Sequence, residues 1–179
     1  IAARRAYEAG FEWLEIHAAH GYLIHEFYSP YSNQRTDEYG GSFENRVRFL
    51  LETVDKVQTV WPEELPLTVR ISGTDWVEDG WLVEDSVALA KLLKKSGVDL
   101  IDCSSGGNVA DVSLPFGPGY QVPISETIRK EAKIATSTVG LIKTPQQADS
   151  IIREERADLV LLGREFLRDA YWPLHAAKE

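Results

Sequence analysis

Two histidines and a tyrosine gather at the end of a short apolar run. The run that starts at Trp13 ends at His17, and His20 and Tyr22 follow in the segment after it. Neutral imidazoles can donate hydrogen bonds to a substrate oxygen that gains negative charge, and a phenol can deliver a proton. A single histidine is more often an ordinary core or surface residue. The grouping instead predicts that His17, His20 and Tyr22 activate a carbonyl.

Zinc binding is the alternative use of the two histidines. His17 and His20 are three positions apart and could share a metal ion, but a catalytic zinc site needs a third protein ligand. The H-E-x-x-H pattern that would indicate such a site does not occur in the sequence. We therefore expect that no metal ion binds here.

Arg70 lies inside the apolar run L-T-V-R-I-S. A guanidinium group is costly to bury without an anionic partner. One candidate partner is a carboxylate such as Glu15 on the neighbouring strand, and the other is an anionic ligand at the mouth of the fold. The two interpretations are compatible with each other.

Glycines end the last two apolar runs. Gly140 follows T-S-T-V, and Gly163 follows L-V-L-L and precedes Arg164. Barrels built from alternating strands and helices commonly bind phosphate at this place through backbone N–H groups and an arginine. Glycines that only turn the chain are the alternative, but the arginine directly after the last run favours phosphate binding.

The elements that position these residues follow a regular alternation. Five short runs rich in Val, Leu, Ile and Thr are separated by longer segments of helical spacing, which predicts a parallel α/β fold. The runs are Trp13 to His17, Leu67 to Ser72, Leu100 to Ser104, Ala135 to Val139 and Leu159 to Gly163. Because each is nearly continuous in apolar residues, we expect strands that are covered on both faces. The expected helices span about residues 45–61, 83–96, 125–131, 145–155 and 165–178.

Cap residues and long connections refine this plan. Gly97 follows one helix as a left-handed cap, Thr144-Pro145 opens another, and Ser125 or Pro123 opens the helix before it. Two connections, residues 18–44 and 105–123, are much longer than the others, and both follow the carboxyl end of a strand. In a (β/α)₈ barrel this end carries the chemistry, so we expect both connections to be functional.

The whole chain of 179 residues is expected to form one globular domain, without a dividing linker or repeat. Its net charge of −9 and its lack of a basic block argue against a nucleic-acid partner. No apolar run is long enough to span a membrane, and residues 1–10 are typical of the second half of an amphipathic helix rather than of a signal peptide. The one cysteine, Cys103, favours a reducing, cytoplasmic setting.

Longer strings connect these features to a known family. H-A-A-H-G-Y-L-I-H-E-F at residues 17–27, followed by S-P-Y-S-N-Q-R-T-D-E-Y-G-G-S-F-E-N-R at residues 29–46, resembles the signature of Old Yellow Enzyme-type ene reductases. The resemblance continues through V-R-I-S at 69–72, D-C-S-S-G-G at 102–107, P-G-Y-Q-V-P at 118–123 and A-D-L-V-L-L-G-R at 157–164. Histidine at both His17 and His20 is most similar to the bacterial, thermophile-type branch, because the yeast-type branch has histidine and asparagine.

The resemblance implies an enzyme and assigns roles to the first group of residues. The enzyme would be an FMN- and NADPH-dependent ene reductase that reduces the C=C bond of α,β-unsaturated carbonyl compounds. His17 and His20 would hold the carbonyl oxygen of the substrate, and Tyr22 would give a proton to its α-carbon. The cofactor would carry the hydride from NADPH to the β-carbon.

The resemblance also implies a cofactor site and a fold. Arg70 would lie beside the N1/O2 edge of the flavin, and Gly163 and Arg164, with Gly140 at the preceding strand end, would hold the FMN phosphate. Where the family usually has T-G-A-V-G, residues 136–140 read T-S-T-V-G, which predicts an altered approach of the backbone to the flavin. The fold would be a (β/α)₈ TIM barrel, of which residues 1–179 supply about the last five βα units.

A complete barrel of this kind has eight strands and about 250 residues or more. We therefore expect that the chain is cut short and needs a complementary N-terminal segment or chain. We also expect a homo-oligomer, although the sequence does not contain the C-terminal tail that in this branch of the family can reach a neighbouring subunit. Two alternatives stay open. One is a catalytically silent barrel fragment, and the other is a dienoyl-CoA-reductase-like flavoenzyme, whose iron–sulfur cluster Cys103 alone cannot supply.

Overall fold

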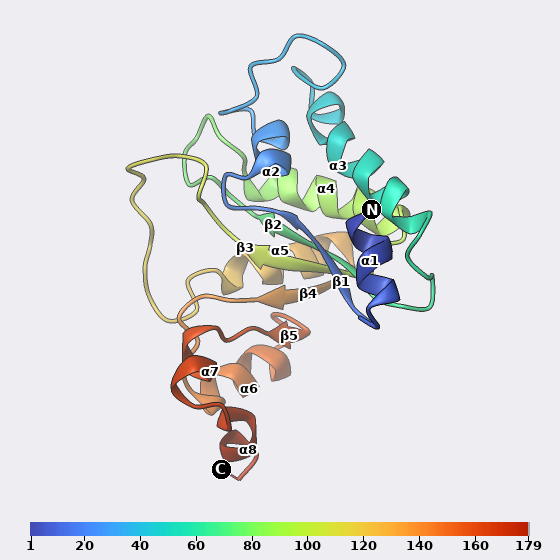
Figure 1. Ribbon diagram of the computed structural model, residues 1–179. Helices are drawn as coiled ribbons and strands as arrows, with labels where there is room; N and C mark the ends of the chain where they lie inside the picture. Colours follow the sequence, from blue (N-terminus) through green and yellow to red (C-terminus); the bar gives the residue numbers. More distant parts are fainter. Residues whose placement is uncertain (179) are drawn as a thin grey trace.

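The computed structural model describes residues 1–178 and contains one five-stranded parallel sheet in the order β1-β2-β3-β4-β5. The strands are β1 Leu14–Ala18, β2 Leu67–Ser72, β3 Leu100–Ser104, β4 Ala135–Thr138 and β5 Leu159–Val160. The helices are α1 Ala2–Glu8, α2 Leu23–Tyr28, α3 Phe43–Gln58, α4 Val83–Lys95, α5 Val122–Ala132, α6 Pro145–Arg153, α7 Arg164–Arg168 and α8 Trp172–Ala176. Strands and helices alternate, and neighbours in sequence are neighbours in the sheet (Figure 1). This is the arrangement of an arc of a (β/α)₈ barrel.

The expected strands are all present. β2 and β3 have the predicted bounds, and β1 begins and ends one residue later than predicted. β4 and β5 end early, at Thr138 and Val160. Within residues 1–178, β5 pairs with β4 alone, so it has backbone partners on one side only.

The predicted caps are confirmed where the chain offers a suitable side chain. Thr144 Oγ1 accepts a hydrogen bond from the backbone N–H of Gln147 at 3.2 Å, and Pro145 starts α6. Gly97 has the left-handed φ of +79° after α4. Of the two openings considered for α5, Pro123 lies in the first turn, whereas Ser125 lies inside the helix.

Two helix predictions were wrong. The single helix expected over residues 165–178 is two short helices, α7 and α8, because Asp169 is extended at φ −141° and its carboxylate accepts the Tyr171 N–H at 2.9 Å. The long connection after β1 contains the short helix α2, in which His25 and Tyr28 are buried. Tertiary packing of those two rings, rather than a long periodic pattern, accounts for α2.

β2 and β3 are buried on both faces, as expected, but only one of these faces is apolar. Alternate residues of β2 and β3, such as Val69, Ile71 and Ile101, belong to the hydrophobic core. The residues between them are polar, and those of β2 and β3 are Thr68, Arg70, Ser72, Asp102 and Ser104. Since side chains alternate across a strand, β1 to β3 present one mainly apolar face and one mainly polar face. In β4, Thr136 and Thr138 are in register with Ile101 and Cys103 of the apolar face.

Helices cover the apolar face only. Val47, Leu50 and Val54 of α3, Leu89 and Leu93 of α4, and Ile124 and Ile128 of α5 join one core cluster with the apolar strand residues. In Figure 1, α4 and α5 pass behind the strands, so the polar face is turned towards the viewer. In a closed barrel the polar face would be the inner one. No helix within residues 1–178 is both long and apolar enough to cross a membrane.

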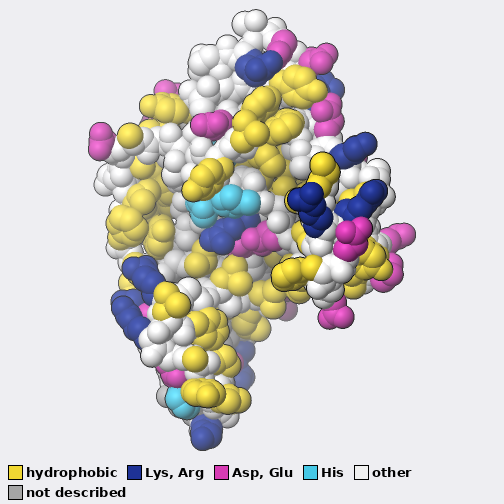
Figure 2. All heavy atoms as spheres, viewed as in Figure 1, with side chains coloured by type: hydrophobic (Ala, Val, Ile, Leu, Met, Phe, Trp, Pro, Cys, Tyr) yellow, Lys and Arg dark blue, Asp and Glu magenta, His cyan; other side chains and the backbone are white. Residues whose placement is uncertain are grey.

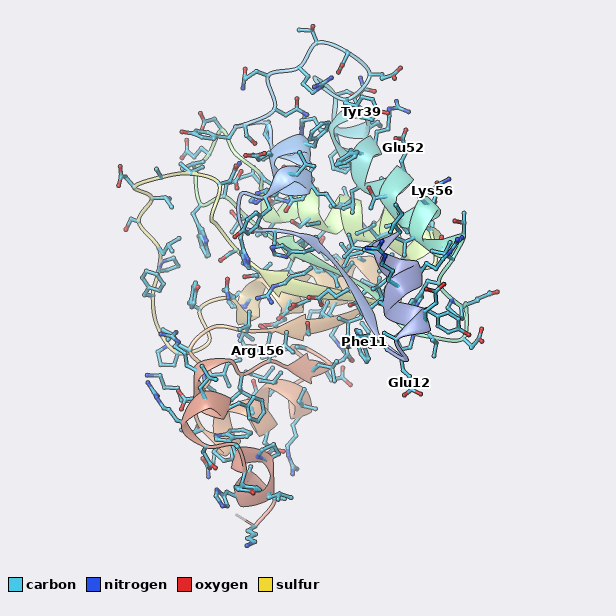
Figure 3. All side chains as sticks on the ribbon, viewed as in Figure 1. Phe11, Glu12, Tyr39, Glu52, Lys56 and Arg156 are labelled. Atoms are coloured by element: carbon cyan, nitrogen blue, oxygen red, sulfur yellow. The ribbon has the colours of Figure 1, made fainter. Side chains whose placement is uncertain are left out.

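The two long connections meet at the carboxyl edge of the sheet. A Cβ on Gly21 would lie 2.2 Å from the carbonyl oxygen of Gly107, so the two backbones touch. Asn108 Nδ2 also donates to Ser32 Oγ at 3.1 Å. Further along the first connection, Tyr39 Oη donates to Glu52 Oε2 of α3 at 3.1 Å (Figure 3). The connections therefore support each other and α3, as expected for segments that build a site.

Candidate active site

Four residues form a row across the polar face of the sheet. His17 of β1 is in register with Arg70 of β2, Arg70 with Asp102 of β3, and Asp102 with Ser137 of β4. Partners in register point to the same side of a parallel sheet, so the row brings together side chains from four strands. Figure 2 shows histidine, basic and acidic side chains next to one another near the centre of this face.

The anionic partner of Arg70 is Asp102 rather than Glu15. Arg70 Nε lies 3.3 Å from Asp102 Oδ2, and the Asp102 carboxyl group is almost fully buried. Ser137 Oγ donates to the other oxygen of Asp102 at 2.8 Å. The side chain of Ser137, at the position where the sequence departs from the family string, therefore holds Asp102 in place. Burial raises the pKa of Asp102, although Arg70 and Ser137 oppose the rise.

Glu15 takes a different role from the one considered for it. Its carboxylate accepts a hydrogen bond from Thr68 Oγ1 at 3.3 Å. Burial and the negative charge of Asp102 raise the pKa of Glu15, and the Arg70 guanidinium lowers it by less. Glu15 thus lies within the electrostatic range of Arg70 without pairing with it.

His20 is held by hydrogen bonds on both its backbone and its ring. Its backbone N–H donates to Ser72 Oγ at 2.9 Å, and its Nε2 lies 2.6 Å from Ser104 Oγ. Its backbone is left-handed, with φ +60°, a conformation that is uncommon outside glycine. Burial, followed by the charge of Arg70, lowers the pKa of His20 to about 4. The ring is therefore neutral near pH 7.

His17 and Tyr22 complete what we call the histidine group, defined as His17, His20 and Tyr22. The ring centroid of His17 lies 5.4 Å from that of His20 and 5.2 Å from that of Tyr22. Loss of hydration and the Arg70 guanidinium lower the pKa of His17. The three side chains that the sequence singled out are thus neighbours, and the Tyr22 side chain is exposed.

A cavity of about 340 Å³ lies beside the histidine group, between the carboxyl ends of β3, β4 and β5. Its wall includes all four residues predicted to bind the cofactor, which are Arg70, Gly140, Gly163 and Arg164. Ser104, which contacts His20, lines the same cavity. The histidine group and the predicted cofactor-binding residues are therefore connected in two ways. Ser104 contacts His20 and lines the cavity, and the row across the sheet joins His17 to Arg70.

The charges of this cavity favour an anion. Besides Arg70 and Arg164, its wall contains Lys143 and Arg168, while Glu165 is its one acidic lining residue and forms an ion pair with Arg168 at 2.8 Å. We call Lys143, Arg164 and Arg168 the cation group. Several cations around a partly open pocket suit a phosphate group.

The two glycines of the cavity differ in their surroundings. A Cβ on Gly140 would lie 3.0 Å from Gln121 Nε2 and from Tyr120 Cε1, and its φ is +126°, so a side chain there would be strained. A Cβ on Gly163 would meet no atom within 4 Å among the residues described. A larger residue at position 140 would therefore disturb the wall of the cavity. At position 163, the contacts within residues 1–178 would allow a side chain.

Besides Arg168 of the cation group, the sequence argument missed four functional candidates. Ser104 and Gln121 line the cavity, and Ser104 Oγ and Ser105 Oγ both donate to Gln121 Oε1. Asp102 pairs with Arg70, and Lys143 adds a cation. The signal for Asp102 was available, since it is an acidic residue at the inward position of an apolar strand. Gln121 and Lys143 carry no such signal.

A metal centre has no support in the geometry. Among residues 1–178, no group of three or more His, Cys, Asp or Glu side chains is arranged to hold a metal ion. His17 and His20 face Arg70 and Ser104 instead.

Comparisons with known proteins place this geometry in context. Residues 1–179 match the sequence profile of the NADH:flavin oxidoreductase / NADH oxidase family. An NADPH dehydrogenase from Geobacillus sp. (strain WCH70) is 59% identical over 177 residues, which are 99% of this chain and 51% of that protein. The chain thus spans about half the length of the curated relatives it matches.

Two solved structures share the fold over 99% of the chain. The Old Yellow Enzyme homologue from Zymomonas mobilis has a TM-score of 0.80 at 30% identity, and the chain covers 49% of it. A 2-naphthoyl-CoA reductase in complex with 2-naphthoyl-CoA has a TM-score of 0.90 at 29% identity, and the chain covers 28% of it. Both are longer proteins in which the matched part is one portion.

Proposed function

Because the chain belongs to the NADH:flavin oxidoreductase / NADH oxidase family and is of Old Yellow Enzyme type, we propose that it forms part of an FMN-dependent enzyme that oxidises NADPH and reduces the C=C bond of α,β-unsaturated carbonyl compounds. The observation that carries the proposal is the shared wall of the site. Ser104 contacts His20 and lines the cavity that also contains Arg70, Gly140 and Arg164. A carbonyl-binding pair therefore lies directly beside an anion-binding cavity.

The charged residues of the cavity fit FMN. The cation group suits the phosphate, and Arg70 suits the negatively charged edge of a reduced flavin. Gly140 has no side chain, and a Cβ there would crowd Tyr120 and Gln121 in the wall of the cavity. The glycine therefore keeps this part of the cavity free for a ligand. When bound, FMN supplies the hydride chemistry between NADPH and the substrate β-carbon.

The histidine group fits the binding of a carbonyl oxygen. The pKa values of His17 and His20 are both lowered, so both rings are neutral donors near pH 7 and do not need to lose a positive charge on binding. Ser104 has a single hydroxyl proton. If it is donated to His20 Nε2 at 2.6 Å rather than to Gln121 Oε1 at 3.4 Å, the ring proton of His20 is on Nδ1 and can be donated to the substrate. Tyr22, exposed beside His17, is the proposed proton donor to the α-carbon.

The proposal includes partners for the chain. Relatives of about twice the length favour a complementary N-terminal barrel segment, and a homo-oligomer remains our prediction. A CoA-thioester substrate is the second candidate, because the 2-naphthoyl-CoA reductase has the higher TM-score of the two structures compared. Cys103 is the one cysteine of the 179 residues and is buried. These residues alone therefore cannot bind the iron–sulfur cluster of a dienoyl-CoA-reductase-like enzyme.

Replacement of both His17 and His20 by alanine in the flavin-loaded enzyme tests the proposal. Phenol binding and cyclohexenone turnover with NADPH should fall about a hundredfold, since each lost hydrogen bond costs about 1 to 1.5 kcal/mol. FMN content, measured by absorbance, should stay unchanged. Unchanged phenol affinity would reject the assignment, and turnover of a CoA thioester but not of cyclohexenone would favour the second candidate.

A further inference from the structure

A buried histidine–aspartate pair lies directly behind the histidine group. His25 of α2 and Asp75, which follows β2, both have 0% of their surface exposed. His25 Nε2 lies 2.9 Å from Asp75 Oδ1. The other carboxylate oxygen accepts hydrogen bonds from Ser29 Oγ at 2.6 Å and from the Trp81 N–H at 2.9 Å. Two hydrogen bonds to one oxygen of Asp75 and the close contact of His25 with the other compensate the buried charge.

The contacts determine where the imidazole of His25 carries its proton. The backbone N–H of Gly21 donates to His25 Nδ1 at 3.0 Å, so Nδ1 presents a lone pair. Nε2 faces a carboxylate oxygen, and two lone pairs at 2.9 Å would repel each other. The proton is therefore on Nε2, and Asp75 stabilises this tautomer.

His25 Nδ1 accepts a hydrogen bond from a strained segment of the backbone, the turn at His20 and Gly21. His20 and Gly21 are both left-handed, with φ of +60° and +73°, and a left-handed residue with a side chain costs about 1 kcal/mol or more. The turn is closed by its own backbone bond from Tyr22 N–H to Ala19 O at 3.2 Å. Two further amide hydrogen bonds anchor it to its surroundings, from His20 N–H to Ser72 Oγ and from Gly21 N–H to His25 Nδ1. Without His25, the Gly21 amide would lose the acceptor that it has here.

The turn decides where the candidate catalytic side chains lie. His20 precedes Gly21 and places its ring against Ser104, while Tyr22 follows Gly21 and places its ring beside His17. Gly107 presses on the other side of the turn, because a Cβ there would lie 2.6 Å from His20 Cα. The turn is thus clamped between His25 and the connection after β3.

We propose that His25, oriented by Asp75, is a positioning residue whose Nδ1 holds the His20–Gly21 turn and thereby aims His20 and Tyr22 into the active site. His25 touches neither substrate nor cofactor in this scheme. It acts as a fixed hydrogen-bond acceptor behind the site. The effect on ligand binding rests on the proposed function, whereas the effect on the turn does not.

Two substitutions separate the halves of the imidazole. In His25→Asn, the side-chain oxygen can replace Nδ1 and accept from Gly21, but the contact with Asp75 is lost. In His25→Gln, the side-chain NH₂ can replace Nε2 and keep the contact with Asp75, but the acceptor for Gly21 is lost. His175→Gln is the matched control, because His175 forms a 2.7 Å pair with Asp169 on the surface.

The primary measurement is amide hydrogen exchange at residues 20–22 in the flavin-loaded enzyme. We expect about tenfold faster exchange of the Gly21 amide in His25→Gln, because a buried donor loses its acceptor. His25→Asn should restore most of the protection, and His175→Gln should match the parent. Equal exchange rates in the two His25 variants would overturn the proposal.

Phenol binding supplies the second measurement, with His20→Ala as the reference. We expect His25→Gln to weaken phenol binding about tenfold while FMN stays bound, with partial recovery in His25→Asn. If His20→Ala itself leaves the phenol affinity unchanged, the proposed function is wrong. The amide exchange data then still test whether His25 holds the His20–Gly21 turn. If His20→Ala weakens binding but His25→Gln does not, the positioning role is wrong.

A measurement on the unmodified enzyme covers the case in which the variants do not fold. The ¹⁵N chemical shifts of His25 should show a protonated Nε2 and an unprotonated Nδ1 near pH 7. A protonated Nδ1 would contradict the proposal, because it could not accept the Gly21 amide.

Discussion

The histidine group and the cation group lie at the same edge of the sheet but are built in different ways. His20 hydrogen-bonds to Ser72 and Ser104, and the turn behind it is held by the fully buried His25. The cation group lies around β5, which has only two residues, and the Arg164 residue is exposed. The histidine group is shaped by partly buried hydrogen bonds within residues 1–178. The cation group presents charges beside a short strand that is paired on one side only.

This difference teaches which part of the site depends on a ligand. Polar groups that are shielded from water and already hydrogen-bonded resist rearrangement. Breaking one of their hydrogen bonds leaves a donor or acceptor without a partner, which costs free energy. Exposed cations lose side-chain freedom only when an anion binds, so their order is gained on binding. We therefore infer a preorganised histidine group and a cation group that FMN and the rest of the barrel complete.

The largest expected effect comes from expressing residues 1–179 alone. Within residues 1–178, β1 and β5 each have one neighbour in the sheet, and open edges promote association. We expect an associated protein with little FMN and no measurable NADPH-dependent reduction of cyclohexenone, although the Gly21 amide should stay protected. Sedimentation, absorbance and amide exchange provide the readouts. A monomer that carries one FMN and turns over cyclohexenone would contradict the comparison.

A smaller effect is expected from Arg164→Ala in the complete enzyme. Loss of a charged hydrogen-bond donor to phosphate costs about 1.5 to 3 kcal/mol, so FMN affinity should fall at least about tenfold and should depend less on salt. Phenol binding at saturating FMN should not change. The control is Arg153→Ala, which removes an exposed arginine of α6 that pairs with Asp149 outside this cavity. An equal loss of FMN affinity in both variants would show that the cation group does not bind the FMN phosphate specifically.

Arg70 lies between the two groups, and its replacement should shift the flavin rather than remove it. Arg70→Leu removes a cation near the reduced ring and should lower the reduction potential by about 30 mV, which corresponds to about 1.4 kcal/mol for two electrons. Asp102→Asn removes the opposing negative charge and should raise the potential. Spectroelectrochemical titration measures both. Shifts of the same sign, or none, would make the Arg70–Asp102 pair purely structural.

The smallest effect concerns pH and the histidine group. The pKa of His20 is lowered from 6.5 to about 4, so between these values the unfolded chain binds the proton and the folded chain does not. Stability from this group is therefore complete above about pH 6.5 and declines as the pH falls towards about 4. Urea unfolding at about pH 7 and pH 5 should show a loss that His20→Gln reduces by at most about 1 kcal/mol. A pH dependence unchanged by His20→Gln would contradict the lowered pKa.

Much of the fold could be predicted from local sequence. The strands from Leu67 to Ser72 and from Leu100 to Ser104 have their predicted bounds, because short runs of β-branched and apolar residues between polar segments indicate buried strands. Thr144 and Gly97 mark helix ends for reasons that act within one turn of the chain. The prediction failed at α2, where a six-residue helix depends on the burial of His25 and Tyr28.

The candidate site could be predicted in its members but not in its connections. His17, His20 and Tyr22 lie together, and Arg70 and Arg164 line one cavity, although their roles remain predictions. Glu15, the carboxylate considered as one candidate partner of Arg70, lies on the other neighbouring strand from the partner that the structure shows. Asp102 and Glu15 both belong to strands beside β2, and only the register and burial show that Asp102 makes the contact.

By itself, the sequence determined the α/β alternation, the family and the residues that gather at the carboxyl ends of the strands, because these follow from periodicity and from motifs that are continuous in the chain. Only the tertiary structure decided that the sheet has a polar face, that Asp102 and Ser137 support Arg70, and that His25 holds the turn of His20 and Gly21. The physical reason is that hydrogen bonds and ion pairs between strands depend on register, side-chain direction and burial. These quantities arise when segments distant in the sequence pack together, and no local pattern encodes them.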